Sequence, residues 1–203
     1  MILKDQKIKI ATILPYKENY TIDKASAASL WVSEFFNKSK FKKTTFIYGN
    51  TTTKNYLTKN YKNIKLKSIK YKLRSSTKEY SNKILKDIKT DNYDIVEVHN
   101  RPLILNILAK KLDNKFIFYF HNDPLSMKGS RSVNERLNIL NIVEKLIFVS
   151  EWTRDRFFLD LDTKLKTKTE VVYPSVEKTK KIKKKNNIIF VGRLNHSKGY
   201  DLY

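Results

Sequence analysis

The sequence predicts an α/β fold, a Rossmann-like doubly wound parallel sheet, and three observations favour it. Short apolar, β-rich segments alternate with segments whose apolar residues recur at helical spacing, as expected of βαβ crossovers. Most strand-like segments are nearly continuous in apolar residues, which is typical of strands buried on both faces. The chain has 203 residues, 40% of them hydrophobic, enough to bury one such core.

The first half of the chain alternates between strand and helix. KIKIATILP at residues 7–15 is apolar and rich in β-branched residues, which predicts a buried first strand. TFIYGN at 45–50 predicts a second strand, and the alternating IKLKSIKY at 64–71 predicts a half-exposed strand near a sheet edge. Ser76 and Glu79 have the spacing of a capping box that opens a helix to about residue 89. The helix expected at 25–39 has one apolar stripe, formed by Ala28, Trp31, Val32, Phe35 and Phe36.

The second half continues the same alternation. DIVEVHN at 94–100, KFIFYFHND at 115–123 and KLIFVSEW at 145–152 each contain an apolar strand followed by polar residues. Helices are predicted at about 102–112 and 133–143, and Ser150 is a suitable N-cap for another. TEVVYP at 169–174 predicts a last short strand. The phenylalanines of these segments are expected to pack in the core, and Glu97, inside a strand, to be structural. Trp152 is open between packing on the domain, which is favoured, and stacking on a sugar.

A composition change after residue 174 predicts a domain boundary. Residues 175–187, SVEKTKKIKKKNN, are charged and poor in apolar residues, as in a linker. Residues 188–203 contain a new buried strand and the start of a helix. We therefore expect a Rossmann-like domain over 1–174 and, after the linker, the truncated start of a second domain.

The composition limits the classes of function. The formal net charge of +22 favours an anionic partner, but only seven of the 42 basic residues are Arg, the usual specific reader of phosphates and bases. A lysine-rich solvated surface is the simplest explanation, and attraction to an anionic membrane surface is the main alternative. The absence of cysteine excludes disulfides, zinc knuckles and thiol nucleophiles. No apolar run of 18 residues and no signal peptide are found, so a cytoplasmic location is expected.

Polar side chains follow several of the predicted strands. In parallel sheets, ligands bind beyond the carboxyl ends of the strands, so these residues are the candidates for a cleft. His121 is expected to act on a substrate hydroxyl or on developing charge, with Asp123 two residues further on, whereas His99 is equally well explained as holding its loop. The other candidates at this edge are Tyr16, Glu18, Arg101, Ser150 and Glu151.

The segment VGRLNHSKG at 191–199 predicts an anion site. Gly192 allows a close turn after a buried strand, and Arg193 and Lys198 bring two cations to the strand tip. Such a pair suits a diphosphate, to which charge-assisted hydrogen bonds are strong.

Five stretches together resemble glycosyltransferase family 4 (group 1). IIFVGRLNHSKGYDL resembles the opening of the second domain in that family, and VSEWTRDRF and VVYPSV resemble the end of the first. FHNDP resembles the histidine-containing loop that faces the donor sugar in that family. VEVHNRP resembles the corresponding stretch in members that build lipopolysaccharide cores and other surface glycans. The matches follow the order of the family and span nearly the whole chain.

The resemblance implies a GT-B fold, of which this chain is the acceptor-side half plus the first strand of the donor domain. It implies a retaining transfer of a hexose-type sugar from a nucleotide sugar to a glycan or lipid-linked acceptor, with no metal and no cofactor. Arg193 and Lys198 match the residues that contact the pyrophosphate, and His121 matches the histidine near the transferred sugar. The glycine-rich loop of the family is replaced by DKASAAS, in which Ser26 or Ser29 can donate instead. The paired glutamates of the second domain lie beyond this sequence, so the fragment alone is expected to be inactive.

Two other classes of function stay open. A GT-B sugar-nucleotide epimerase would share the cleft but would need acid–base carboxylates that are not evident in the sequence. A basic RNA-binding or membrane-binding domain predicts clustered Arg and aromatic residues, whereas the few Arg here are spread along the chain. The expected partners are therefore a nucleotide sugar, a glycan or lipid-linked acceptor and the inner face of the cytoplasmic membrane, with no nucleic acid.

Overall fold

A single parallel sheet forms the centre of the molecule. The computed structural model describes residues 8–16, 18–66 and 75–175, and its sheet has seven strands in the order β3-β2-β1-β4-β5-β6-β7. Every neighbouring pair is parallel, which confirms the predicted α/β, Rossmann-like class. The strands are β1 (Ile10–Ile13), β2 (Thr45–Gly49), β3 (Tyr61–Asn63), β4 (Ile95–His99), β5 (Lys115–Phe120), β6 (Lys145–Phe148) and β7 (Thr169–Val171).

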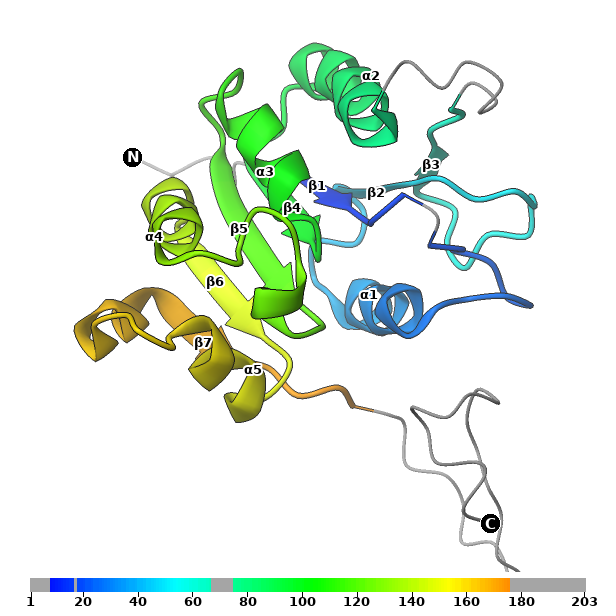
Figure 1. The fold of residues 1–203 in the computed structure, drawn as a ribbon. Helices are drawn as coiled ribbons and strands as arrows, with labels where there is room; N and C mark the ends of the chain where they lie inside the picture. Colours follow the sequence, from blue (N-terminus) through cyan, green and yellow to red (C-terminus); the bar gives the residue numbers. More distant parts are fainter. Residues whose placement is uncertain (1–7, 17, 67–74, 176–203) are drawn as a thin grey trace, which may run out of the picture.

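Helices cover both faces of this sheet (Figure 1). They are α1 (Ala27–Lys38), α2 (Ser76–Asp91), α3 (Pro102–Ala109), α4 (Val133–Ile142) and α5 (Glu151–Phe157), with 3-10 turns η1 (Pro124–Ser126) and η2 (Thr163–Lys168). The strand order reverses between β1 and β4, so the loops that follow these two strands diverge from one another. Such a switch point is where open α/β sheets usually bind ligands.

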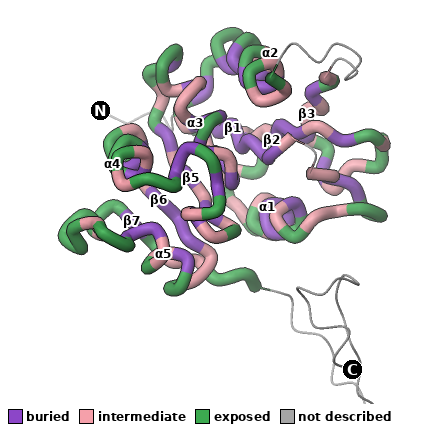
Figure 2. The backbone as a smooth tube through the Cα atoms, viewed as in Figure 1, coloured by how far each residue is buried: buried purple, intermediate pink, exposed green. Residues whose placement is uncertain are grey.

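Two separate hydrophobic cores lie on the two faces of the sheet. The larger core packs α2, α3, α4 and α5 against side chains such as Val98, Phe118 and Phe148. The smaller core lies under α1 and includes Trp31 and Ile47. Buried positions run through the central strands, and exposed positions concentrate on the outer sides of the helices (Figure 2).

Helix caps confirm part of the sequence prediction and correct another part. Ser150 caps α5 by accepting a hydrogen bond from the Thr153 amide at 3.2 Å, as predicted. The capping box expected at residues 76–79 is wrong, because α2 begins one residue earlier than that motif requires, after Ser75, and has no side-chain cap. A complete capping box instead opens α4, where Ser132 and Glu135 bond each other's backbone amides.

The edge strand β3 is shorter and earlier than the alternating pattern predicted. It pairs with β2 only from Tyr61 to Asn63, and no strand lies at residues 64–66. The reason is a competing set of side-chain bonds: Asn50 donates to the Ile64 carbonyl at 2.9 Å, and Asn63 exchanges two bonds with the Thr51 backbone. These bonds satisfy the backbone groups that would otherwise extend the ladder. The remainder of the predicted strand lies outside the described residues.

The predicted linker and second-domain segment lie, apart from Ser175, outside the described residues and remain predictions. The same holds for Gly192, Arg193 and Lys198. In the described ranges no helix is both long and apolar enough to cross a bilayer.

Candidate active site

Two histidines meet at the carboxyl edge of the sheet. His99 is the last residue of β4, and His121 directly follows β5, its neighbour in the sheet. The Nδ1 atom of His99 lies 2.9 Å from Nε2 of His121, so the two imidazoles share a hydrogen bond. The prediction that both side chains lie on one rim is confirmed, and the residue that pairs with His121 is His99.

The loop after β4 holds this pair in place. Asn100 adopts a left-handed backbone conformation, with φ of 56°, which asparagine tolerates better than most residues. Its amide donates to the Tyr119 carbonyl at 2.8 Å, and its side-chain oxygen accepts from the His121 amide at 3.1 Å. Both ends of the histidine pair are therefore tied to the same backbone turn.

Aromatic rings enclose the two imidazoles. The Tyr119 ring stacks on His99 with centroids 4.3 Å apart and planes 7° apart. Trp31 of α1 meets His121 edge-on, with centroids 5.2 Å apart. His99 is only 1% exposed. Burial holds the pKa of both imidazoles below the ordinary value, well below for His99, where the charge of His121 adds to the effect, and at about 4 for His121.

The lowered histidine pKa values predict a loss of stability in mild acid. The unfolded chain takes up a proton near pH 6.5 and folded His121 only near pH 4, so the free energy of unfolding falls as pH drops through this window. His121 alone is expected to lower the free energy of unfolding by about 2 kcal/mol between pH 7 and pH 5. Urea unfolding at both pH values checks it, with His121→Gln as the variant that should lose less.

Glu97 acts in the opposite direction in that experiment. Its raised pKa means that the folded protein takes up this proton before the unfolded chain does, which stabilises the fold as pH falls. The comparison of His121→Gln with the parent chain removes this common contribution. An equal fall in both proteins would contradict the prediction.

Asp123, which the sequence placed next to His121, contacts other residues instead. Its Oδ1 accepts from the Leu125 amide at 3.0 Å and caps η1, and its Oδ2 lies 3.2 Å from Nη2 of Arg156. No hydrogen bond joins Asp123 to His121 in the described part of the chain. The structure thus gives Asp123 a turn-forming and charge-pairing role, and any catalytic role stays a prediction.

The remaining candidates lie at the start of α1 and in the segments that follow β1 and β4. Ser26 caps α1 through the Ser29 amide, and Ser29 is fully buried with its hydroxyl 3.1 Å from that of Ser26. The Arg101 guanidinium lies 5.8 Å from the centre of the Tyr16 ring, across the switch point. Glu18 is half-buried beyond β1.

The start of α5 differs from the expectation at one aromatic residue. Glu151 pairs with Arg154 in the first turn of this helix. Packing of Trp152 on the domain was favoured over stacking on a sugar, but Trp152 is 59% exposed, and the Arg156 guanidinium lies 5.8 Å from the centre of its ring. Its position in α5 points it away from Phe157, which reaches the core.

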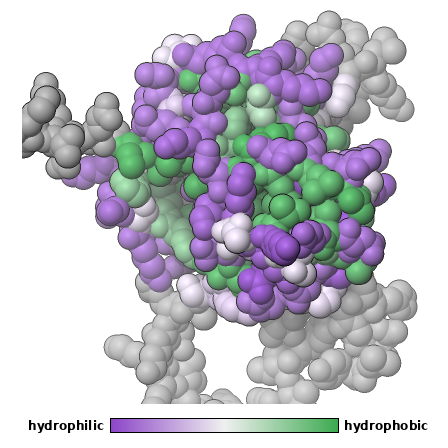
Figure 3. Space-filling view, turned by 90° about the vertical axis from the view of Figure 1, so that its left-hand side faces the viewer, coloured by the Kyte–Doolittle hydropathy of each residue, from purple (hydrophilic) through white to green (hydrophobic). Residues whose placement is uncertain are grey.

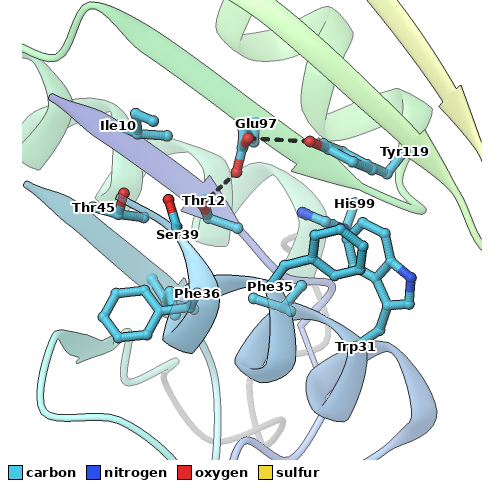
Figure 4. A pocket seen from close by; sticks show the side chains of 12 residues that line it. Ile10, Thr12, Trp31, Phe35, Phe36, Ser39, Thr45, Glu97, His99 and Tyr119 are labelled. Carbon is cyan, nitrogen blue, oxygen red and sulfur yellow. Dashed lines mark hydrogen bonds between the residues drawn. The ribbon is translucent and has the colours of Figure 1, made fainter. Parts of the chain in front are cut away.

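A cavity of about 150 Å³ extends from His99 under α1 (Figure 4). Its floor contains Thr12, Glu97, His99 and Tyr119, and its apolar wall comes from α1 residues such as Phe35. Glu97 accepts hydrogen bonds from the Thr12 hydroxyl at 2.6 Å and the Tyr119 hydroxyl at 3.1 Å. Burial raises the pKa of the Glu97 carboxyl, and these two bonds lower it.

The sequence prediction missed this cavity, although one signal for it was present. Glu97 and His99 are two residues apart in a strand, so their side chains lie on the same face. A charged residue at an inward strand position is costly without partners, and its two partners come from β1 and β5. In the described ranges no three His, Asp or Glu side chains gather closely enough to hold a metal ion.

Comparison with known proteins places this architecture among glycosyltransferases. Residues 48–180 match the family model of Glycosyltransferase Family 4. No curated protein is similar enough to the sequence to count as a match.

Solved structures share the fold at low sequence identity. Anabaena Alr3699/HepE in complex with UDP-glucose is 12% identical, with a TM-score of 0.55 over 84% of this chain and 44% of its own. A glycosyltransferase from Rickettsia africae ESF-5 is 18% identical, with a TM-score of 0.53 over 83% and 43%. UDP-N-acetylglucosamine 2-epimerase from Rickettsia bellii reaches a TM-score of 0.48 at 16% identity, over 81% and 44%. The chain thus spans less than half the length of each of these proteins.

Proposed function

Because the chain belongs to glycosyltransferase family 4, we propose that it forms the acceptor-side half of an enzyme that transfers a sugar from a nucleotide sugar to an acceptor hydroxyl. The proposal includes a retaining reaction and a glycan or lipid-linked acceptor of the lipopolysaccharide type. The nucleotide sugar is the co-substrate, and the crystallised UDP-glucose complex of the Anabaena protein supports this class of donor.

The observation that carries the proposal is the His99–His121 pair at the switch point of the sheet. Both imidazoles are neutral at pH 7, since burial lowers their pKa values. A neutral imidazole can accept a hydrogen bond from a sugar hydroxyl or donate one to it without adding a charge that would need a counter-ion. Such a group suits a cleft in which a sugar is positioned while its bond to a diphosphate breaks.

Charge stabilisation in the complete enzyme is assigned to Arg193 and Lys198. A leaving diphosphate develops negative charge as the sugar departs, and preorganised cations lower the barrier by meeting that charge. With these two cations in place, the acceptor hydroxyl can attack the sugar on the face from which the diphosphate leaves, and no metal is needed to stabilise the diphosphate.

The test is a transfer assay with the complete enzyme and a panel of nucleotide sugars that includes UDP-glucose. Release of nucleoside diphosphate that depends on an added glycan or lipid-linked acceptor is the expected result. Conversion of the nucleotide sugar into its epimer without an acceptor would instead identify an epimerase. Neither reaction with any nucleotide sugar would contradict both enzyme classes.

Positive charge favours a location at an anionic membrane surface. The formal net charge is +22, and hydrophilic side chains cover much of the face drawn in Figure 3. Each Lys close to an anionic surface contributes about 1 kcal/mol, which salt screens. Sedimentation with anionic lipid vesicles should show binding that falls as salt rises, whereas equal binding to neutral vesicles would count against this location.

A further inference from the structure

His99 connects two environments through its two ring nitrogens. Nδ1 is bonded to Nε2 of His121, at the edge of the sheet. Nε2 is fully buried, and nothing in the described part of the chain bonds it. The ring lines the cavity under α1, and Figure 4 shows one of its nitrogens facing that space.

The shared hydrogen bond permits two arrangements of protons. If the proton is on His99 Nδ1, then His121 Nε2 is the acceptor and His121 must carry its own proton on Nδ1. If the proton is on His121 Nε2, then His99 Nδ1 accepts it and His99 carries its proton on Nε2, inside the cavity. Both rings are neutral, because burial lowers their pKa values, so one arrangement or the other applies.

The cavity favours a proton on Nε2 of His99. The hydroxyl groups of Thr12 and Tyr119 both donate to Glu97, so both oxygens of this carboxyl are acceptors. The Thr45 hydroxyl donates to the Phe41 carbonyl instead of into the cavity. The Glu97 carboxyl oxygens are therefore acceptors on the same strand face as the unbonded nitrogen, and an N–H group is complementary to them.

We propose that His99 is a positioning residue that holds His121 as the tautomer with its proton on Nε2. His121 then presents the lone pair of Nδ1, which nothing in the described ranges bonds, to the cleft. In the cleft it acts as an acceptor for a substrate hydroxyl, and this last step alone rests on the proposed function. Glu97 supports the arrangement from the far side of His99.

The test is nitrogen-detected NMR of the chain labelled at histidine, which reports directly which ring nitrogen carries each proton. The chain has three histidines, so His99→Asn, His121→Asn and His196→Asn assign every signal. At pH 7 we expect His99 and His121 both to be protonated on Nε2. Protonation of either ring on Nδ1 would overturn the proposal.

Variants separate positioning from simple packing. In His99→Asn the side-chain oxygen can still accept from His121, so the His121 tautomer should be kept, whereas in His99→Phe it should shift toward Nδ1–H. Glu97→Gln should produce a smaller shift in the same direction. Ser39→Ala removes a cavity-lining hydroxyl that accepts from the Phe41 amide and bonds neither histidine, so it should produce none. An unchanged His121 tautomer in both His99→Phe and Glu97→Gln would refute the role. If His99→Phe does not fold, Glu97→Gln decides alone.

These spectra need no substrate, so they test the tautomer even if the proposed sugar transfer is wrong. In the complete enzyme, His99→Phe should lower kcat more than it raises KM, and His99→Asn, which keeps an acceptor for His121, should lose less of kcat than His99→Phe does. A loss of transfer that is equal in the two variants would contradict positioning.

Discussion

His121→Ala is expected to lower sugar transfer by the complete enzyme about a hundredfold or more, which is the lower range for loss of a positioned proton-transfer or hydrogen-bonding group. The imidazole follows β5, one strand away from the switch point, and it is held on three sides by His99, Trp31 and the Asn100 turn. Removal of the ring leaves a space that alanine does not fill. Steady-state transfer kinetics check the prediction, and kcat should fall more than KM rises.

Trp152→Ala provides the matched control for His121→Ala. Trp152 is a large ring-bearing side chain just after β6, but it is exposed and lies on α5, and in the described part of the chain no hydrogen bond or ring contact joins it to the histidine pair. Its loss should leave transfer nearly unchanged. If His121→Ala folds, as judged by circular dichroism, and keeps near-parental kcat, the histidine pair is not the reactive part of the site.

Arg193→Ala and Lys198→Ala are each expected to lower turnover about a hundredfold, the scale observed when one preorganised charge stabiliser is lost. These residues lie outside the described part of the structure, and the expectation comes from their sequence context. They flank a predicted turn between Gly192 and Gly199, with no carboxylate between them to neutralise their charge. Bisubstrate kinetics should show the loss mainly in kcat, and the free energy of unfolding should barely change.

Lys183→Ala is the control for these two variants. It removes the same single positive charge from the chain, but from the lysine-rich stretch before the second predicted domain. Near-parental turnover of Lys183→Ala together with a large loss in the other two would assign the effect to position. Equal effects in all three would attribute it to net charge, and the donor-site assignment would then be wrong.

The order of the elements could be predicted because it depends on local patterns. All residues of KFIFYF after the first lysine are apolar or aromatic, and the segment forms strand β5 within the expected range. The meeting of His99 and His121 followed from the general rule that parallel strands end at one edge. Neither prediction needed knowledge of a specific long-range contact.

The details that the sequence did not reveal depend on contacts between residues far apart in sequence. Asp123 was grouped with His121 because they are two residues apart, but its charge partner is Arg156, on a later helix. The short β3 results from bonds made by Asn50 and Asn63, which periodicity does not register. Glu97 was expected to be structural, and its place in a cavity depends on partners from two other strands.

The two cores on opposite faces of the sheet separate most of the buried apolar residues from the histidine pair and the cavity beside it. Four helices and a stack of phenylalanines including Phe120, Phe148 and Phe157 close the larger core. The histidine pair and its cavity lie against α1, over the smaller one. Substitutions on the inner side of α1 are therefore expected to change the shape of this cavity while the larger core is left intact. In a protein with this arrangement, α1 can change in sequence without compensating changes in the larger core.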